Sequence, residues 1–74
     1  MKDHTVYIDC ANLDLRNIVR TNSILIVAVY KNELPLNATL VYAGRNYTIK
    51  EHTKVIEKQT NYPLYVYIAE DRFG

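Results

Sequence analysis

The sequence predicts a mostly β fold: a single small five-stranded barrel or sandwich of antiparallel hairpins over residues 1–74, with at most one short helix. The longest apolar run, residues 24–30, is rich in β-branched side chains, whose stiff χ1 angles suit a pleated sheet. Other strand-like runs, bounded by polar turn residues, lie at 5–10, 39–43, 46–50 and 64–68. With 74 residues and one cysteine, the chain has no internal disulfide, so its stability depends on these strands or on association.

Residues 5–10 form the first expected strand. Val6, Ile8 and Cys10 share its apolar face, because residues two apart in a strand point the same way. On that face Cys10 is expected to act as a small buried hydrophobic residue and not as a nucleophile.

The next stretch, residues 12–20, has apolar side chains at helical spacing. Leu15, Ile18 and Val19 recur at i, i+3 and i+4, and Asn12 is a suitable N-cap. We expect a short helix here, or an irregular turn that makes the same apolar contacts.

Residues 23–30 form the central strand, and both of its faces are apolar. The residues divide by face into Leu25, Val27 and Val29 on one side and Ile24, Ile26, Ala28 and Tyr30 on the other. A strand that is apolar on both sides has to be covered on both sides. We expect segments 12–20 and 64–68 to cover one face and the hairpin at 39–50 to cover the other. If that hairpin does not pack there, the exposed face is itself an interface.

The stretch after the central strand is expected to reverse in a tight hairpin at residues 31–33. Pro35 cannot donate a ladder hydrogen bond, so residues 34–37 are expected to form an edge or a bulge. The run from Val29 to Leu40 resembles the hairpin of immunoglobulin-like modules in bacterial and phage proteins, with Glu33 and Asn37 in place of that pattern's glycines. The resemblance implies a β-hairpin.

A second hairpin is expected around a two-residue turn at Gly44 and Arg45. In that register Tyr42 opposes Tyr47 and Leu40 opposes Ile49, so these four side chains share one face.

The C-terminal third contains one ambiguous segment and one strong strand. Residues 51–60 permit a helix, because Thr48–Glu51 matches a capping box, but their β-branched residues favour a strand or an irregular crossing. Residues 64–68 are expected to form a strand. Its core face is expected to carry Leu64, Val66 and Ile68, with Tyr65, Tyr67 and Ala69 opposite.

The titratable residues do not form a recognisable catalytic or metal-binding pattern. His4, His52 and Cys10 lack the spacing of a zinc site or a nucleophile motif, and the two glycines form no phosphate-binding loop. We therefore expect no enzymatic activity, no cofactor and no metal. The N-terminus lacks a signal-peptide pattern, so a cytoplasmic protein without a membrane segment is expected.

The function that fits these features is a small non-enzymatic protein-binding module: an inhibitor, adaptor or assembly subunit. Such proteins are common in phages and mobile elements, and a homo-oligomer would supply extra burial. Each of the seven tyrosines suits a half-buried strand position, which β-propensity favours, and together they also suggest a tyrosine-lined contact surface. The partner-binding residues expected from the sequence are Tyr65, Tyr67, Tyr7, Arg45 and Phe73. The alternative is a small barrel of the OB or SH3-like kind that binds single-stranded nucleic acid through a tyrosine face; it ranks second because the net charge is only +1.

Overall fold

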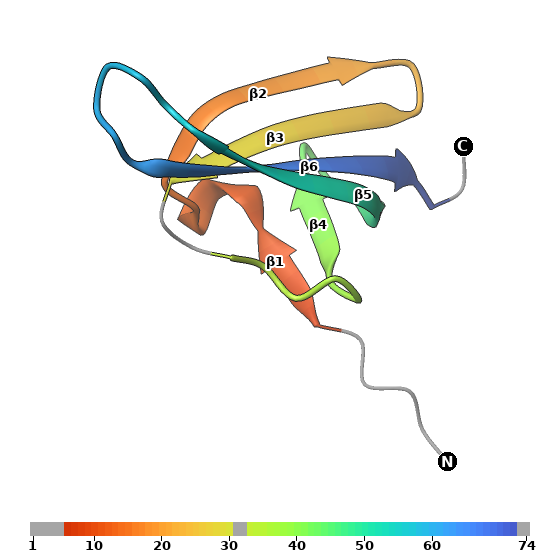
Figure 1. Ribbon diagram of the computed structural model, residues 1–74. Coiled ribbons are helices and arrows are strands. Elements are labelled where there is room, and N and C mark those ends of the chain that lie inside the picture. Colours follow the sequence, from red (N-terminus) through yellow and green to blue (C-terminus); the bar gives the residue numbers. More distant parts are fainter. Residues whose placement is uncertain (1–5, 31–32, 73–74) are drawn as a thin grey trace.

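The computed structural model describes residues 6–30 and 33–72, which form one six-stranded sheet in the order β1-β4-β5-β6-β3-β2. The strands are β1 (Tyr7–Asp9), β2 (Leu15–Thr21), β3 (Ile24–Tyr30), β4 (Thr39–Tyr42), β5 (Arg45–Ile56) and β6 (Pro63–Asp71). The sheet curls into a half-barrel (Figure 1), and neighbouring strands are antiparallel except for the parallel pair β1–β4. The mostly β prediction is confirmed, with six strands in place of five.

The core lies on the inner, concave side of the sheet. Its centre is β3, where Leu25, Val27 and Val29 are fully buried. The other buried members of the cluster are Cys10, Leu34, Ala38, Leu40, Tyr47, Ile49, Tyr67 and Ala69. The predicted division of the central strand into two faces is therefore correct, and the hairpin carrying Leu40 and Tyr47 packs in the same cluster as the Leu25 face.

The helix expected at residues 12–20 is wrong, and so is its alternative, an irregular turn, because Leu15–Thr21 forms the strand β2. A β-bulge between Leu15 and Asn17 inserts one extra residue into the strand. The insertion brings Leu15 and Ile18 to the same inner side, so a bulged strand reproduces the i, i+3 spacing of a helix. Val19, paired with Ile26, falls on the opposite face. Asn12 ends a single 3-10 turn, η1 (Cys10–Asn12), instead of starting a helix.

The facing predicted for β6 is also wrong. Tyr67 and Ala69 are 1% and 0% exposed, so they belong to the core. Tyr67 pairs with Val27 and Ala69 with Leu25, both of which face inward. Because cross-strand partners share a face, the set of Leu64, Val66 and Ile68 lies on the outer side.

The hairpin predicted between β4 and β5 exists, but its turn lies one residue earlier. Ala43 and Gly44 form the turn with φ angles of 52° and 76°, as in a type I′ turn, and Tyr42 pairs with Arg45. Leu40 therefore opposes Tyr47 instead of Ile49. The observed register differs from the expected one by two residues. Because side chains two apart in a strand share a face, Leu40, Tyr42, Tyr47 and Ile49 still lie on one face.

The hairpin expected at residues 31–33 is not formed. Lys31 and Asn32 lie outside the described residues, but β3 pairs with β2 and β6, and β4 pairs with β1 and β5. The loop before β4 instead turns into the core: Leu34 and Ala38 are buried, and the Ala38 N–H donates to the Pro35 carbonyl oxygen at 3.1 Å. Within residues 6–30 and 33–72, β3 and β4 thus do not pair as the hairpin implied by the immunoglobulin-like resemblance would require.

The ambiguous segment after residue 50 is a strand up to Ile56, as its β-branched residues favour. β5 is 12 residues long, because a bulge between Ile49 and Glu51 lets it bend and continue along β6. The turn that follows is closed by the Asn61 N–H, which donates to the Glu57 carbonyl oxygen at 2.7 Å, and Asn61 has a φ of 60°.

Candidate interaction surfaces

The outer face of the sheet carries an apolar surface centred on β3 and β6, with one apolar residue each from β2 and β5 at its sides. Its rows follow from the strand registers: Val19, Ile26 and Ile68 lie side by side, and Ala28 lies beside Val66. A third row contains Tyr30, Leu64 and Val55. We call this surface the outer patch: Val19, Ile24, Ile26, Ala28, Tyr30, Val55, Leu64, Val66 and Ile68.

The outer patch is uncovered in the described part of the chain. Ile26 is 36% exposed and Val19 45%, although Leu25 and Val27 beside Ile26 are fully buried. The segments outside the sheet supply Cys10, Leu34 and Ala38 to the inner core instead of packing on the outside. The two faces of the central strand are thus chemically alike and differ only in cover.

One end of the outer patch is fixed by a cluster around Glu57. The Glu57 carboxylate accepts hydrogen bonds from Arg16 Nε at 2.9 Å, Thr60 Oγ1 at 2.9 Å and Tyr30 Oη at 3.2 Å. These contacts tie β2 and β3 to the turn between β5 and β6. They lower the pKa of Glu57, chiefly through the hydrogen bond from Arg16 and next through that from Thr60.

The Glu57 cluster predicts a pH dependence of stability. A carboxyl group whose pKa is lowered by folding stabilises the fold above its unfolded pKa, about 4.3, and this contribution is lost as the pH falls through the folded pKa. Glu57→Gln should lower stability near pH 7 and flatten the fall in stability below about pH 5. Thermal unfolding of wild type and variant at a series of pH values measures this.

The control for this prediction is Glu51→Gln, which changes an exposed residue of the preceding strand β5, outside the cluster. It should leave the acid limb of the wild-type profile in place. Equal pH profiles for wild type and Glu57→Gln would contradict the assigned role.

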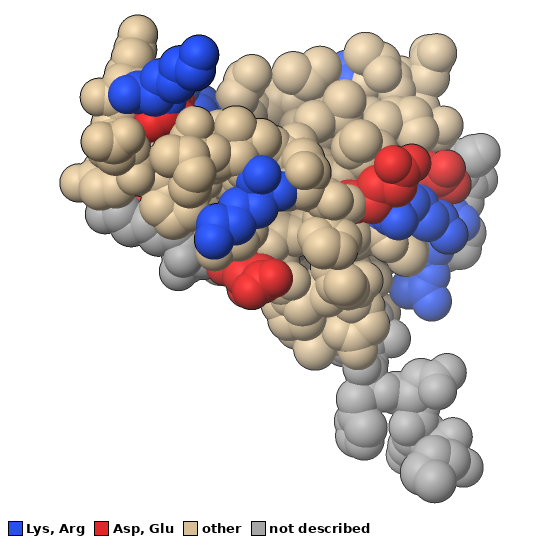
Figure 2. Space-filling model, in the orientation of Figure 1, with Lys and Arg blue, Asp and Glu red and all other residues tan. Residues whose placement is uncertain are grey.

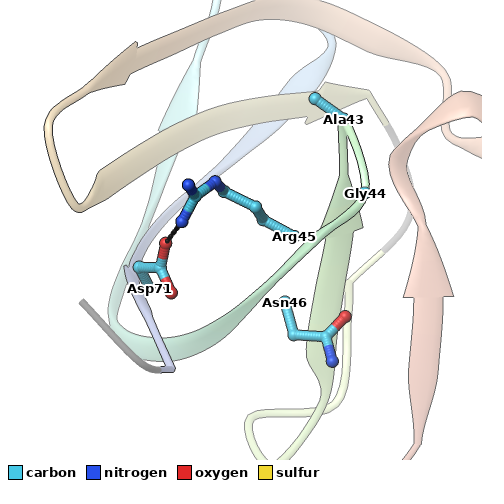
Figure 3. Close-up of a pocket in the computed structure, with 5 residues that line it drawn as sticks. All are labelled: Ala43, Gly44, Arg45, Asn46 and Asp71. Atoms are coloured by element: carbon cyan, nitrogen blue, oxygen red, sulfur yellow. Dashed lines mark hydrogen bonds and ion pairs between the residues drawn. The ribbon is translucent and has the colours of Figure 1, made fainter.

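A shallow depression of about 400 Å³ lies at the β4–β5 turn, lined by Ala43, Gly44, Arg45, Asn46 and Asp71 (Figure 3). Arg45 Nη1 lies 2.9 Å from Asp71 Oδ2, so the exposed guanidinium is already paired with a nearly buried carboxylate. The depression therefore offers little unpaired charge to a ligand.

The structure does not gather the five predicted partner-binding residues on one surface. Tyr67 is buried, and its hydroxyl accepts the Leu34 N–H at 2.6 Å; Tyr65 is half-buried beside the core. The prediction that Tyr65 and Tyr67 form an exposed contact surface is therefore wrong. Tyr7 is 57% exposed on β1, Arg45 begins β5, and Phe73 lies outside the described residues.

The five predicted partner-binding residues do not include the outer patch, but the sequence predicts an interface on the exposed face of the central strand if the hairpin at 39–50 leaves it uncovered. The run at 24–30 has two apolar faces, and the sequence does not show which segment covers the second face. The prediction fails at β6, because both sets of alternating side chains in this strand are apolar or aromatic. Alternation alone does not say which set faces a core.

The described residues offer little nucleophilic or metal-binding chemistry. Burial, together with the nearby Asp9 carboxylate, raises the pKa of the Cys10 thiol to about 11, which keeps it protonated at neutral pH. The His52 ring stacks on Tyr67 with a centroid distance of 6.3 Å. Within 6–30 and 33–72, no three side chains of His, Cys, Asp or Glu converge as metal ligands.

Charge is distributed in small mixed groups. On the face seen in Figure 2, basic and acidic side chains form small mixed groups, and uncharged surface lies between the groups. A groove of one sign, which a phosphate backbone would require, is not seen on that face. Among the described residues, no helix is long and apolar enough to cross a bilayer.

Comparison with known proteins gives no relative from which a function could be transferred. No protein-family model matches the chain, and no curated protein and no solved structure is significantly similar to it. The interaction surfaces therefore have to be interpreted from their own geometry.

Proposed function

We propose that this protein is a non-enzymatic protein-binding module, an assembly subunit that acts through the outer patch. The observation that carries the proposal is the contrast across β3: Leu25 is fully buried on one side, and Ile26 is 36% exposed on the other. Soluble monomers rarely expose contiguous apolar patches larger than a few hundred Å². Cover from another protein molecule would remove this surface from water.

The occupant that fits the outer patch best is a second copy of the same chain. The nine residues of the outer patch and the polar residues in the same rows cover four strands about 4.8 Å apart and four rows about 6.6 Å apart, an area of about 500 Å². Those polar residues are Asn17, Thr21, Thr48, Glu51, Thr53 and Glu70. Two such faces, with the polar residues included, would bury about 1,000 Å² in total, which reaches the lower bound of a specific interface. The side chains at the centre of the patch, Ile26, Ile68, Ala28 and Val66, are uncharged, and Glu51 lies at the β5 end of the Ile26 row. The centres of two copies can therefore stack without like-charge repulsion.

Charged residues lie at the margin of this surface. Glu51 pairs with Ile68, and Glu70 pairs with Ile24, at the edges of the apolar rows. An apolar centre with a charged rim is the usual anatomy of a protein interface. The nucleic-acid alternative loses its main support, because Tyr67 lies in the core. A cytoplasmic setting and an origin in a phage or mobile element fit this class of protein and belong to the proposal.

The proposal predicts a concentration-dependent dimer. Size-exclusion chromatography with light scattering should give twice the monomer mass for the wild type and the monomer mass for Ile26→Lys, which places two charges at the centre of the interface. Ile26→Thr keeps β-propensity and should weaken the dimer to a smaller degree. The control is Leu36→Lys, at an apolar residue that is 53% exposed in the loop before β4; it should dimerise like the wild type.

Two results would overturn the proposal. One is a wild-type protein that stays monomeric up to about 1 mM, where even a complex of about −4 kcal/mol forms. The other is a folded Ile26→Lys variant, verified by circular dichroism, that dimerises as strongly as the wild type.

A further inference from the structure

The second half of β5 has an open strand edge. β4 pairs only with Arg45–Thr48, whereas β6 accompanies β5 from Tyr47 to Ile56. From residue 49 to 56, therefore, one side of β5 has no partner strand among the described residues. Figure 1 shows the hairpin of β5 and β6 extending past the end of β4.

The open edge has free backbone groups at alternate residues. The Glu57 N–H donates to the Tyr62 carbonyl oxygen at 3.1 Å, so the backbone N–H of Glu57 points toward the β6 side of the hairpin. In an antiparallel ladder the direction of the backbone groups alternates. Thr53 and Val55 therefore face β6, and the N–H and C=O groups of His52, Lys54 and Ile56 face the open side.

The loop before β4 leaves this edge open. Leu34 is buried, and its N–H donates to the Tyr67 hydroxyl, which draws the chain inward and away from the line of β5. Pro35 has no N–H with which to continue a ladder. A strand of another molecule could therefore pair with β5 in the space beyond the end of β4.

The other two edges of the sheet are less receptive. β1 is only three residues long. β2 is bulged after Leu15, and the Ile18 N–H is already bonded to the Asn17 side-chain oxygen at 2.9 Å. Bulges and capped donors are common ways to protect an edge. The edge at 50–56 lacks such a cap among the described hydrogen bonds.

The charge beside the open edge selects the kind of strand. His52, Lys54 and Ile56 share the inner side of β5, and Lys54 Nζ lies 5.8 Å from the centre of the Tyr65 ring. Lys58 is exposed in the adjoining turn. Of the acidic residues nearby, Glu57 is paired with Arg16, Glu33 lies near Tyr67, and Glu51 lies on the outer face of β5. Two β5 edges paired about Lys54 would put like charges opposite each other, which disfavours a second copy.

We propose that the open edge of β5 binds an extended acidic segment of another protein as an added antiparallel strand. The backbone groups of His52, Lys54 and Ile56 supply the ladder, and acidic side chains at alternate positions of the segment meet Lys54 and Lys58. Strand addition of this kind takes affinity from the backbone and specificity from alternate side chains. The site adjoins the outer patch at Val55, whose side chain lies on the outer face, but its ladder groups lie along the strand edge and do not require the dimer.

The test is an NMR titration of the full chain with a capped peptide of about seven alternating glutamate and threonine residues. The amide signals of His52, Lys54 and Ile56 should shift, and their hydrogen exchange should slow. Lys54→Glu should weaken binding about tenfold and favour a matching lysine–threonine peptide. His52→Pro, which removes one outward N–H and leaves both lysines, should also weaken binding.

The matched control is Arg20→Glu, the same charge change at an exposed residue of the opposite edge strand β2. It should leave binding of the acidic peptide almost unchanged. Binding that is equal for both peptides, or equal after Lys54→Glu, would overturn the proposal. So would concentration-dependent shifts of the same amides without peptide, which would mean that a second copy occupies the edge. Loss of the dimer in Ile26→Lys with peptide binding intact would separate the two proposals.

Discussion

Replacing Leu25 by alanine is expected to destabilise the fold by about 3 kcal/mol. Leu25 is fully buried at the centre of β3, between Arg20 of β2 and Ala69 of β6. The substitution removes buried methyl groups and leaves a cavity that a curled sheet fills only in part. A chain of 74 residues has a total stability of about 4–11 kcal/mol, so this loss is a large fraction of it.

The matched substitution is Ile26→Ala, one residue further along the same strand. Ile26 is 36% exposed on the opposite face, so its replacement should cost about 1 kcal/mol or less in the monomer. Urea unfolding followed by circular dichroism, at a low protein concentration that limits dimer formation, measures both values. Equal losses for the two variants would contradict the assigned difference in burial between the two faces, and a larger loss for Ile26→Ala would mean that the faces are exchanged.

Tyr67→Phe is expected to lower stability, whereas Tyr47→Phe is expected to leave it unchanged or raise it. The Tyr67 hydroxyl accepts the buried Leu34 N–H at 2.6 Å, so its removal strands a buried donor and should cost about 1–3 kcal/mol. The Tyr47 hydroxyl is also buried but has no hydrogen-bond partner among the described residues. Removing it should leave stability unchanged or raise it by about 1 kcal/mol.

These two substitutions remove the same atom from the same core cluster. Differences in ring burial therefore cancel to first order, and the difference between the two effects reports on hydrogen bonding alone. The unfolding midpoints of the two variants and the wild type, measured together, give the comparison. A loss of similar size in both variants would contradict the assigned partners.

The β class and the division of the central strand were predictable from the sequence, because both follow from local properties. β-branched residues favour strands wherever they occur, and alternation puts Leu25 and Ile26 on opposite faces in any sheet. The failure at residues 12–20 has a local cause that the pattern does not reveal. A bulge after Leu15 adds one residue, so two inward side chains fall at helical spacing.

The orientation of β6 was not predictable because it depends on pairing between distant strands. Tyr67 lies in the core because β6 pairs with β3 in the register that places it opposite Val27. Leu64, Val66 and Ile68 are just as apolar as the set that is buried, so alternation gave no preference. The tyrosine contact surface failed for the same reason, and the outer patch consists largely of the residues expected inside.

The open edge of β5 was hidden for a related reason. Its existence depends on two lengths that local patterns do not give: β5 has 12 residues and β4 only four. The sequence did locate Pro35 as a residue that interrupts a ladder. It did not show that the chain beside Pro35 would turn into the core and leave the edge vacant.

The most direct test of the central claim is an isotope-filtered NOE experiment on a mixture of labelled and unlabelled protein. The claim is that the outer patch is the contact surface between two copies of the chain. Intermolecular NOEs are expected between the methyl groups of Ile26, Val66 and Ile68. A dimer whose intermolecular NOEs lie elsewhere, or a mixture that shows none at millimolar concentration, would contradict the account.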